Sequence, residues 1–292
     1  MTRFRKRLWL FVLPSMFLIL VVAIYPLLWM VYTSFSNMYL PRAHRAVFIG
    51  LGNYAKVMSE QYMLNSLQVT ALFVIGAVIL ELVLGMGLAL LLNTRIRGRS
   101  FFRAAFILPL MVPPIVSAMN WKALLHPTYG AINYYLRVVF GEGLVGDWLA
   151  NRTTALPSLI VVDAWQWTPF MALVLLAGLQ TLPEEQFEAA QIDGATSWQQ
   201  FWNITIPLMR NVIMAALLVR MIDALKLFDL VYAMTEGGPG IATETLSFLV
   251  YKTGMKYFQM GQAAAFGIIY LVGVTALAIV VHRNLRRERE AV

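Results

Sequence analysis

The chain has 292 residues, of which 60% are apolar and only 13% charged, and its mean hydropathy is +0.68. This leaves too little polar surface to cover a soluble globule, so lipid is the expected solvent. The absence of Cys excludes disulfides, thiolate zinc sites and cysteine nucleophiles, and three separate His offer little for a metal site.

The formal charge is +8, from 23 Lys and Arg against 15 Asp and Glu. A nucleic-acid binder needs a basic stripe with stacking aromatics on a soluble face, which this sequence lacks. We therefore expect the basic residues to lie at membrane borders. We expect no nucleic-acid partner, no metal, no cofactor and no catalytic residues.

Six segments are long and apolar enough to cross a membrane, which takes about 20 residues of helix. They are residues 8–35, 64–92, 102–125, 156–182, 208–234 and 263–281. The first resembles a signal peptide, but its apolar run is too long and no cleavage pattern follows, so it is expected to stay as an anchor. The sequence therefore predicts an all-α integral membrane fold, with residues 1–292 as one transmembrane domain.

Basic residues predict the orientation of these spans. They cluster before the first span, between the second and third, and after the sixth: Arg3, Arg5, Lys6, Arg7; Arg95, Arg97, Arg99, Arg103; Arg283, Arg286, Arg287, Arg289. Alternating spans place all three clusters on one side of the membrane. Because basic residues favour the inner side, both termini are expected to be cytoplasmic.

The loop 183–207 also falls on the cytoplasmic side but has no Lys or Arg. Pro183 at a first helical position, followed by acidic residues, predicts the start of a helix that ends at Gly194. A second short helix is expected from about Ser197 to Asn203, before the next span restarts at Pro207. Such a helix-turn-helix suits docking in a groove of a partner, although an ordinary interfacial connector is the alternative.

Two stretches carry a family resemblance. Glu188-Ala189-Ala190, Gly194 and the segment 204–207 resemble the EAA motif of ABC importer permeases, with Ile206 where Leu is usual. The segments 228–230, 234–240, 245–246 and 261–265, with Tyr251, resemble the carbohydrate-uptake subfamily of the maltose, glycerol-phosphate and trehalose permease type. The resemblance covers most of the chain.

The resemblance implies an assembly. Such permeases pair with a second homologous permease as a heterodimer, two ATP-binding cassette subunits and an external sugar-binding protein. The implied ATPase-coupling residues are Glu188, Ala189, Ala190, Asp193 and Gly194. Because the chain has no G-x-x-x-x-G-K-[ST] phosphate loop, it is not expected to be an enzyme, and ATP hydrolysis is expected in a separate subunit.

Six charged residues fall inside the predicted spans and away from the span ends: Glu81, Asp163, Arg220, Asp223, Lys226 and Asp229. A charge at the bilayer centre costs roughly 2.5–3.5 kcal/mol, so each should face protein or a water-filled cavity. The last four alternate in sign every three residues, and neighbours can pair along one helix. Each step of three residues rotates the position by about 60° around the helix. The first and last of these four residues, Arg220 and Asp229, therefore cannot share a face of the helix. These charges either form ion pairs that hold span five in place or, in the case of Arg220 and Asp223, line a sugar path.

Span four carries aromatic and amide side chains of the kinds that bind sugars. An aromatic belt at the membrane border is an equally simple interpretation of its Trp residues. The family resemblance favours the sugar path, and we include Asp163 of the same span in it. The candidate path residues are Asp163, Gln166, Trp167, Phe170, Arg220, Asp223, Ala224 and Leu227.

Two alternatives remain open. One is a permease for glycerol phosphate or another small polar solute, although phosphate favours a pair of Arg residues and only Arg220 is well placed. The other is a self-contained secondary carrier, which would need coupling-ion carboxylates or repeated halves. The sequence leaves the particular sugar and the roles of Glu81, Lys226 and Asp229 unassigned.

Overall fold

A computed structural model describes residues 12–94, 98–141 and 146–289. In this part of the chain the structure consists of helices and connecting loops, with one isolated antiparallel bridge between Ser36 and Phe48. The basic residues Arg3, Arg5, Lys6, Arg7, Arg95 and Arg97 lie outside the described residues.

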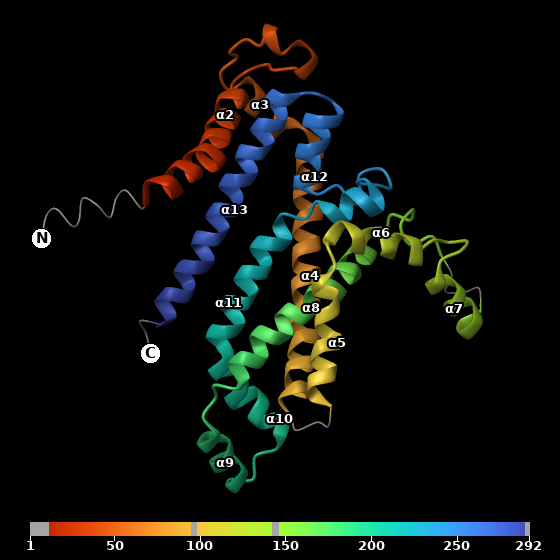
Figure 1. Cartoon of the computed structure of the whole chain (residues 1–292), viewed down its shortest axis with the longest axis vertical. Helices are drawn as coiled ribbons and strands as arrows, with labels where there is room; N and C mark the ends of the chain where they lie inside the picture. The colour runs from red at the N-terminus through yellow and green to blue at the C-terminus, as the bar shows by residue number, and fades with distance from the viewer. Residues whose placement is uncertain (1–11, 95–97, 142–145, 290–292) are drawn as a thin grey trace, which may run out of the picture. The chain divides into compact units, whose positions relative to one another are not determined.

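The helices follow one another along the chain as Figure 1 shows. The first half contains η1 (Leu20–Ile24), α2 (Tyr25–Ser34), η2 (Leu40–Arg45), α3 (Gly52–Ser59), α4 (Gln61–Asn93), α5 (Arg99–Met111), α6 (Pro114–Leu124) and α7 (Ala131–Phe140). The second half contains α8 (Ala155–Leu179), α9 (Glu184–Ile192), α10 (Ser197–Gln200), η4 (Phe201–Thr205), α11 (Ile206–Leu225), η5 (Val231–Thr235), α12 (Leu246–Tyr251), η6 (Lys252–Lys256) and α13 (Met260–Arg289).

Among the described residues, five helices are long and apolar enough to cross a membrane: Val12–Ser34, Gln61–Asn93, Ala155–Leu179, Ser197–Leu225 and Met260–Ile279. A sixth span exists only if the bent pair α5 and α6 counts as one. The predicted all-α membrane fold is thus confirmed in its class. The count of six depends on how that bent pair crosses.

The predicted third span is broken rather than kinked. Its two helices meet at 96°. Val112 is extended (φ −80°, ψ 128°), as is Pro113 (φ −56°, ψ 138°), and neither Pro113 nor Pro114 has an N–H for a helical hydrogen bond. Pro109, the other proline of this segment, lies inside α5 without ending it.

The predicted fifth span, 208–234, is wrong at both ends. The helix already begins at Ser197 and runs without interruption to Leu225. Pro207 does not restart it, because a π-helical turn at Phe201–Thr205 precedes the proline, and the N–H of Ile206 bonds to the carbonyl of Phe201. The helix ends before Leu227, whose carbonyl accepts a hydrogen bond from the Thr245 hydroxyl at 3.1 Å.

The described residues divide into two compact units. One contains residues 12–64 and 249–273, and the other contains residues from 65 to 248 and from 274 to 289. The first has its own small core of Val57, Met63, Leu249, Ala265 and Phe266. There the Asn53 amide also donates to the carbonyls of Ser34 (2.8 Å) and Ser36 (2.7 Å), which fixes the end of α2.

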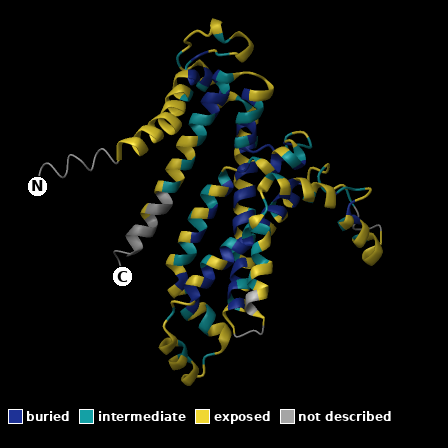
Figure 2. Ribbon diagram, viewed as in Figure 1, coloured by how far each residue is buried: buried dark blue, intermediate teal, exposed yellow. Residues whose placement is uncertain are grey.

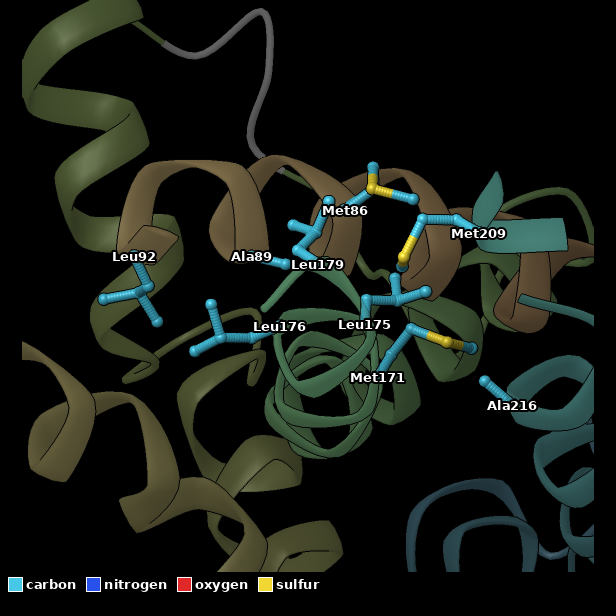
Figure 3. Close-up of a cluster of buried hydrophobic side chains, with 9 residues drawn as sticks. All are labelled: Met86, Ala89, Leu92, Met171, Leu175, Leu176, Leu179, Met209 and Ala216. Carbon is cyan, nitrogen blue, oxygen red and sulfur yellow. The ribbon is translucent and has the colours of Figure 1, made fainter. Parts of the chain in front are cut away.

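The core of the second unit is formed by α4, α8 and α11. Figure 3 shows its buried side chains: Met86, Ala89, Leu92, Met171, Leu175, Leu176, Leu179, Met209 and Ala216. Helix α8 supplies four of them and is mostly buried, whereas the apolar helix Val12–Ser34 is exposed from Val12 to Trp29 (Figure 2). Because lipid tails are as apolar as Leu, close packing rather than the hydrophobic effect must hold these helices together.

One glycine of α4 allows this close approach. A Cβ on Gly85 would lie 2.7 Å from Cγ of Met171 and 3.1 Å from the backbone nitrogen of Ala172 in α8. Gly87 stands two positions later in the same helix, but a Cβ there would meet nothing within 4 Å. The contact between α4 and α8 therefore depends on Gly85 and not on Gly87.

We predict that Gly85→Val lowers the stability of the chain by about 1–3 kcal/mol, because it forces α8 away from α4. Gly87→Val, which makes the same change in helix propensity, is the matched control and should have little effect. Thermal unfolding of the two purified variants in detergent tests this. Equal unfolding midpoints would contradict the packing role of Gly85.

Candidate functional site

One arginine lies at the centre of the second unit. The side chain of Arg220, in α11, is 1% exposed, and three carboxylates from three helices surround it. Its Nε and Nη2 donate to the two oxygens of Glu81 in α4, at 2.6 and 2.7 Å. Nη2 also donates to Asp163 of α8 at 2.5 Å, and Nη1 donates to Asp223 of α11 at 2.9 Å.

These bonds leave Arg220 little capacity for other partners. A guanidinium has five N–H groups, and the bonds to carboxylates engage all three of its nitrogens. The ring of Trp167 covers the guanidinium as well, with its centroid 4.8 Å from Cζ. The arginine therefore acts as the common partner of α4, α8 and α11.

Glu81 has a partner that the sequence did not identify. It is fully buried and forms the bidentate pair with Arg220 across 139 positions of sequence. A carboxylate in the middle of an apolar span indicates a buried cationic partner, but it does not single out Arg220. Of the four charged residues that alternate in sign on the predicted span five, only Arg220 and Asp223 lie within one helix. Lys226 and Asp229 follow the end of α11.

A cavity of about 230 Å³ opens beside this cluster. Seven of the eight predicted path residues line it: Asp163, Gln166, Trp167, Arg220, Asp223, Ala224 and Leu227. Pro114, Lys226, Phe228, Asp229 and Leu230 complete the lining. The eighth predicted residue, Phe170, is not among them and packs edge-on against Trp167, with 6.3 Å between ring centroids.

Gln166 joins the cavity to the break between α5 and α6. Its side-chain nitrogen donates to the carbonyl of Val112 at 2.8 Å, at the point where the paired prolines have removed the helical donors. Gln166 is 2% exposed, and within the described residues its amide oxygen has no hydrogen-bond partner. It therefore positions the broken span beside the cavity that it lines.

The predicted helix-turn-helix is present at the end of α8 and α11 farthest from α6 and α7 (Figure 1). Helix α9 begins at Glu184, with Pro183 as its cap rather than its first residue. It ends in a Schellman motif, in which Ala195 N–H bonds to the Ala190 carbonyl and Gly194 N–H to the Gln191 carbonyl. Gly194 has φ +77°, the left-handed conformation that this motif requires.

Helix α10 begins with a capping box that was not predicted from the sequence. Thr196 accepts from the Gln199 N–H, and the Gln199 side chain accepts from the Thr196 N–H. Around it the surface is apolar, with Ile192 88% and Trp198 68% exposed. Of the predicted coupling residues, Glu188, Ala189, Asp193 and Gly194 are exposed and Ala190 is half-buried.

Known proteins resemble this chain over most of its length. Residues 81–290 match the family described as binding-protein-dependent transport system inner membrane component. The trehalose/maltose transport system permease protein MalF of Thermococcus litoralis is 38% identical, over 93% of this chain and 91% of that protein. The sn-glycerol-3-phosphate transport system permease protein UgpA of Agrobacterium fabrum is 37% identical, over 79% of this chain and 78% of that protein.

A solved structure shares the fold. It is a chain of a bacterial alginate ABC transporter in complex with an alginate pentasaccharide-bound periplasmic protein. The TM-score is 0.83 at 20% identity, and the match covers 98% of this chain and 96% of that one.

We predict that Arg220→Met lowers the stability of the folded chain by about 3–5 kcal/mol, because it leaves Glu81 and Asp163 buried without a cationic partner. Lys226→Met, which removes a positive charge from an exposed position of the same cavity, is the control and should change stability by less than about 0.5 kcal/mol. Thermal unfolding of purified protein and the amount of chain in the membrane are the measurements. A stable Arg220→Met variant would show that the cluster does not hold the helices.

Proposed function

We propose that this chain, which belongs to the inner membrane component family of binding-protein-dependent transport systems, forms half of the translocation path of an ATP-driven sugar importer. The observation that carries the proposal is the cavity beside Arg220. Residues that the sequence spreads over spans four and five line it together, within a family whose members are transport components.

The cavity chemistry supports a sugar as the solute. Carboxylates and amides hydrogen-bond hydroxyl groups, and Asp223 and Gln166 supply both at its wall. A relative 38% identical over most of the chain is named for trehalose and maltose transport. We assign Asp163, Gln166, Trp167, Asp223, Ala224 and Leu227 to the sugar path. Arg220 holds the carboxylates in place, and Phe170 supports Trp167.

Further chains complete the path and supply energy in this proposal. The cavity holds about 230 Å³, less than most small-molecule sites, so a second homologous permease is needed to enclose a sugar. Two ATP-binding cassette subunits hydrolyse ATP on the cytoplasmic side. An external sugar-binding protein delivers the solute, and the alginate transporter that shares this fold was likewise crystallised with a periplasmic protein that carries an alginate pentasaccharide.

The loop 183–207 couples this chain to an ATPase subunit. Its exposed apolar residues Ile192 and Trp198 suit insertion into a groove. In this proposal the loop lies on the cytoplasmic side, as the basic residues of the sequence predict for both chain termini. The second helix of the loop continues directly into the helix that carries Arg220 and Asp223, and the whole spans 29 residues, or roughly 40 Å. Movement of the docked loop is thereby transmitted to the cavity through one continuous helix.

The coupling role predicts the effect of two changes. Gly194→Pro cannot adopt the positive φ of the Schellman motif, and Glu188→Lys reverses an exposed charge of α9. Each should abolish uptake and co-purification of the ATPase subunits while the chain still inserts in the membrane. Gly194→Asn, which tolerates the left-handed conformation, is the matched control and should retain both. Wild-type uptake by either of the two disruptive variants would contradict the coupling role.

The path assignment predicts a substrate effect for Asp223. Asp223→Asn keeps the shape of the side chain, and Arg220 remains paired with Glu81 and Asp163. Because a hydrogen bond from a hydroxyl group to a carboxylate contributes about 1.5–3 kcal/mol, half-maximal uptake should need on the order of tenfold more sugar. Uptake per complex in proteoliposomes measures this. A loss confined to the amount of complex in the membrane would contradict the assignment.

A further inference from the structure

Among the charged groups that line the cavity, Asp223 and Asp229 are exposed hydrogen-bond acceptors and Lys226 is an exposed donor. All three nitrogens of Arg220 bond to carboxylates and Trp167 covers its face, so the arginine offers little to a solute. The buried amide oxygen of Gln166 has no partner within the described residues, and Asp223 is 47% exposed. Such a lining matches solutes that donate hydrogen bonds, as hydroxyl groups do.

The net charge of the cavity also determines which solutes it favours. Three carboxylates line it, those of Asp163, Asp223 and Asp229, and the buried Glu81 bonds to Arg220 outside the lining. Against these four stand the two cations Arg220 and Lys226. The formal excess is two negative charges, and it stays negative if one of the buried carboxylates carries a proton. Asp223 and Asp229 are both exposed at the cavity, so their charges face any solute there.

Similarity alone does not decide between charged and uncharged solutes. The two relatives of nearly equal identity are named for trehalose and maltose and for sn-glycerol-3-phosphate. The cavity distinguishes these classes, because a phosphate brings acceptor oxygens and negative charge to a wall that already has both. Phosphate sites instead present free Arg or Lys side chains. Here the one arginine of the lining is already bonded to carboxylates, and the exposed Lys226 shares the lining with the exposed carboxylates of Asp223 and Asp229.

We infer that this cavity takes hydroxyl-rich solutes without negative charge and excludes phosphorylated, sulfonated or carboxylated ones. The inference rests on the proposed role of the cavity in the translocation path. It assigns the selectivity to Asp223 and Asp229, whose exposed carboxylates repel anions and accept hydrogen bonds from hydroxyl groups.

Because the chain has no Cys, a single thiol can report the charge of the cavity. Leu227→Cys and, in parallel, the half-buried Phe228→Cys introduce that thiol in the lining. The assembled complex is treated with cationic trimethylammonioethyl methanethiosulfonate or anionic sulfonatoethyl methanethiosulfonate. Mass spectrometry of this chain then gives the two labelling rates, each divided by the rate for free mercaptoethanol.

The cationic reagent should react on the order of tenfold faster than the anionic one. Adding Asp223→Asn and Asp229→Asn should bring the normalised ratio close to one. Adding Glu60→Gln, outside the cavity, should leave the ratio unchanged. An anionic rate equal to or above the cationic rate at both thiols would overturn the inference.

An uptake assay separates this inference from the proposed function. Proteoliposomes with the complete complex and its binding protein are offered trehalose, maltose and sn-glycerol-3-phosphate, one at a time. Uptake of a sugar but not of sn-glycerol-3-phosphate supports the inference. Uptake of sn-glycerol-3-phosphate at the rate of a sugar overturns the inference but is compatible with the proposed importer function. Uptake of none of them contradicts the sugar assignment, and the thiol ratio then still decides the charge of the cavity.

Discussion

The bond between Arg220 and its carboxylates is the interaction on which the second unit depends. Three helices packed in lipid gain little from burying apolar side chains, since the surrounding tails are equally apolar. A guanidinium that bonds Glu81, Asp163 and Asp223 ties α4, α8 and α11 at one point. Removing Arg220 leaves the buried carboxylates of Glu81 and Asp163 without a cationic partner, so the cluster depends on the arginine.

The same cluster shapes the cavity that we propose as part of the transport path. Arg220 holds Asp223 at the edge of the cavity. The same ion pair that stabilises the helices therefore also presents a carboxylate that a solute can contact. Gln166 extends this arrangement to the broken span through the carbonyl of Val112. The continuous helix from Ser197 to Leu225 then connects the cavity to the loop 183–207, so that one helix carries both the proposed coupling surface and the cluster.

Much of this arrangement could be predicted from local sequence patterns. The apolar spans, the end of α9 at Gly194 and the three-residue spacing of Arg220 and Asp223 depend on neighbouring residues alone. The partner of Glu81 could not be predicted, because it lies 139 positions away. Nor could the end of α11, where no Pro or Gly stands and a hydroxyl from Thr245 bonds to the carbonyl of Leu227. The capping box of Thr196 and Gln199 has a local pattern and could have been predicted.

A structure of the assembled complex with its transported solute bound is the most direct test of the role of this cluster. We expect an uncharged sugar in the cavity, with a hydroxyl group within hydrogen-bond distance of Asp223 and with Arg220 still bonded to Glu81 and Asp163. A solute bound elsewhere in the chain, or a guanidinium released from its carboxylates to bind an anionic solute, would contradict it.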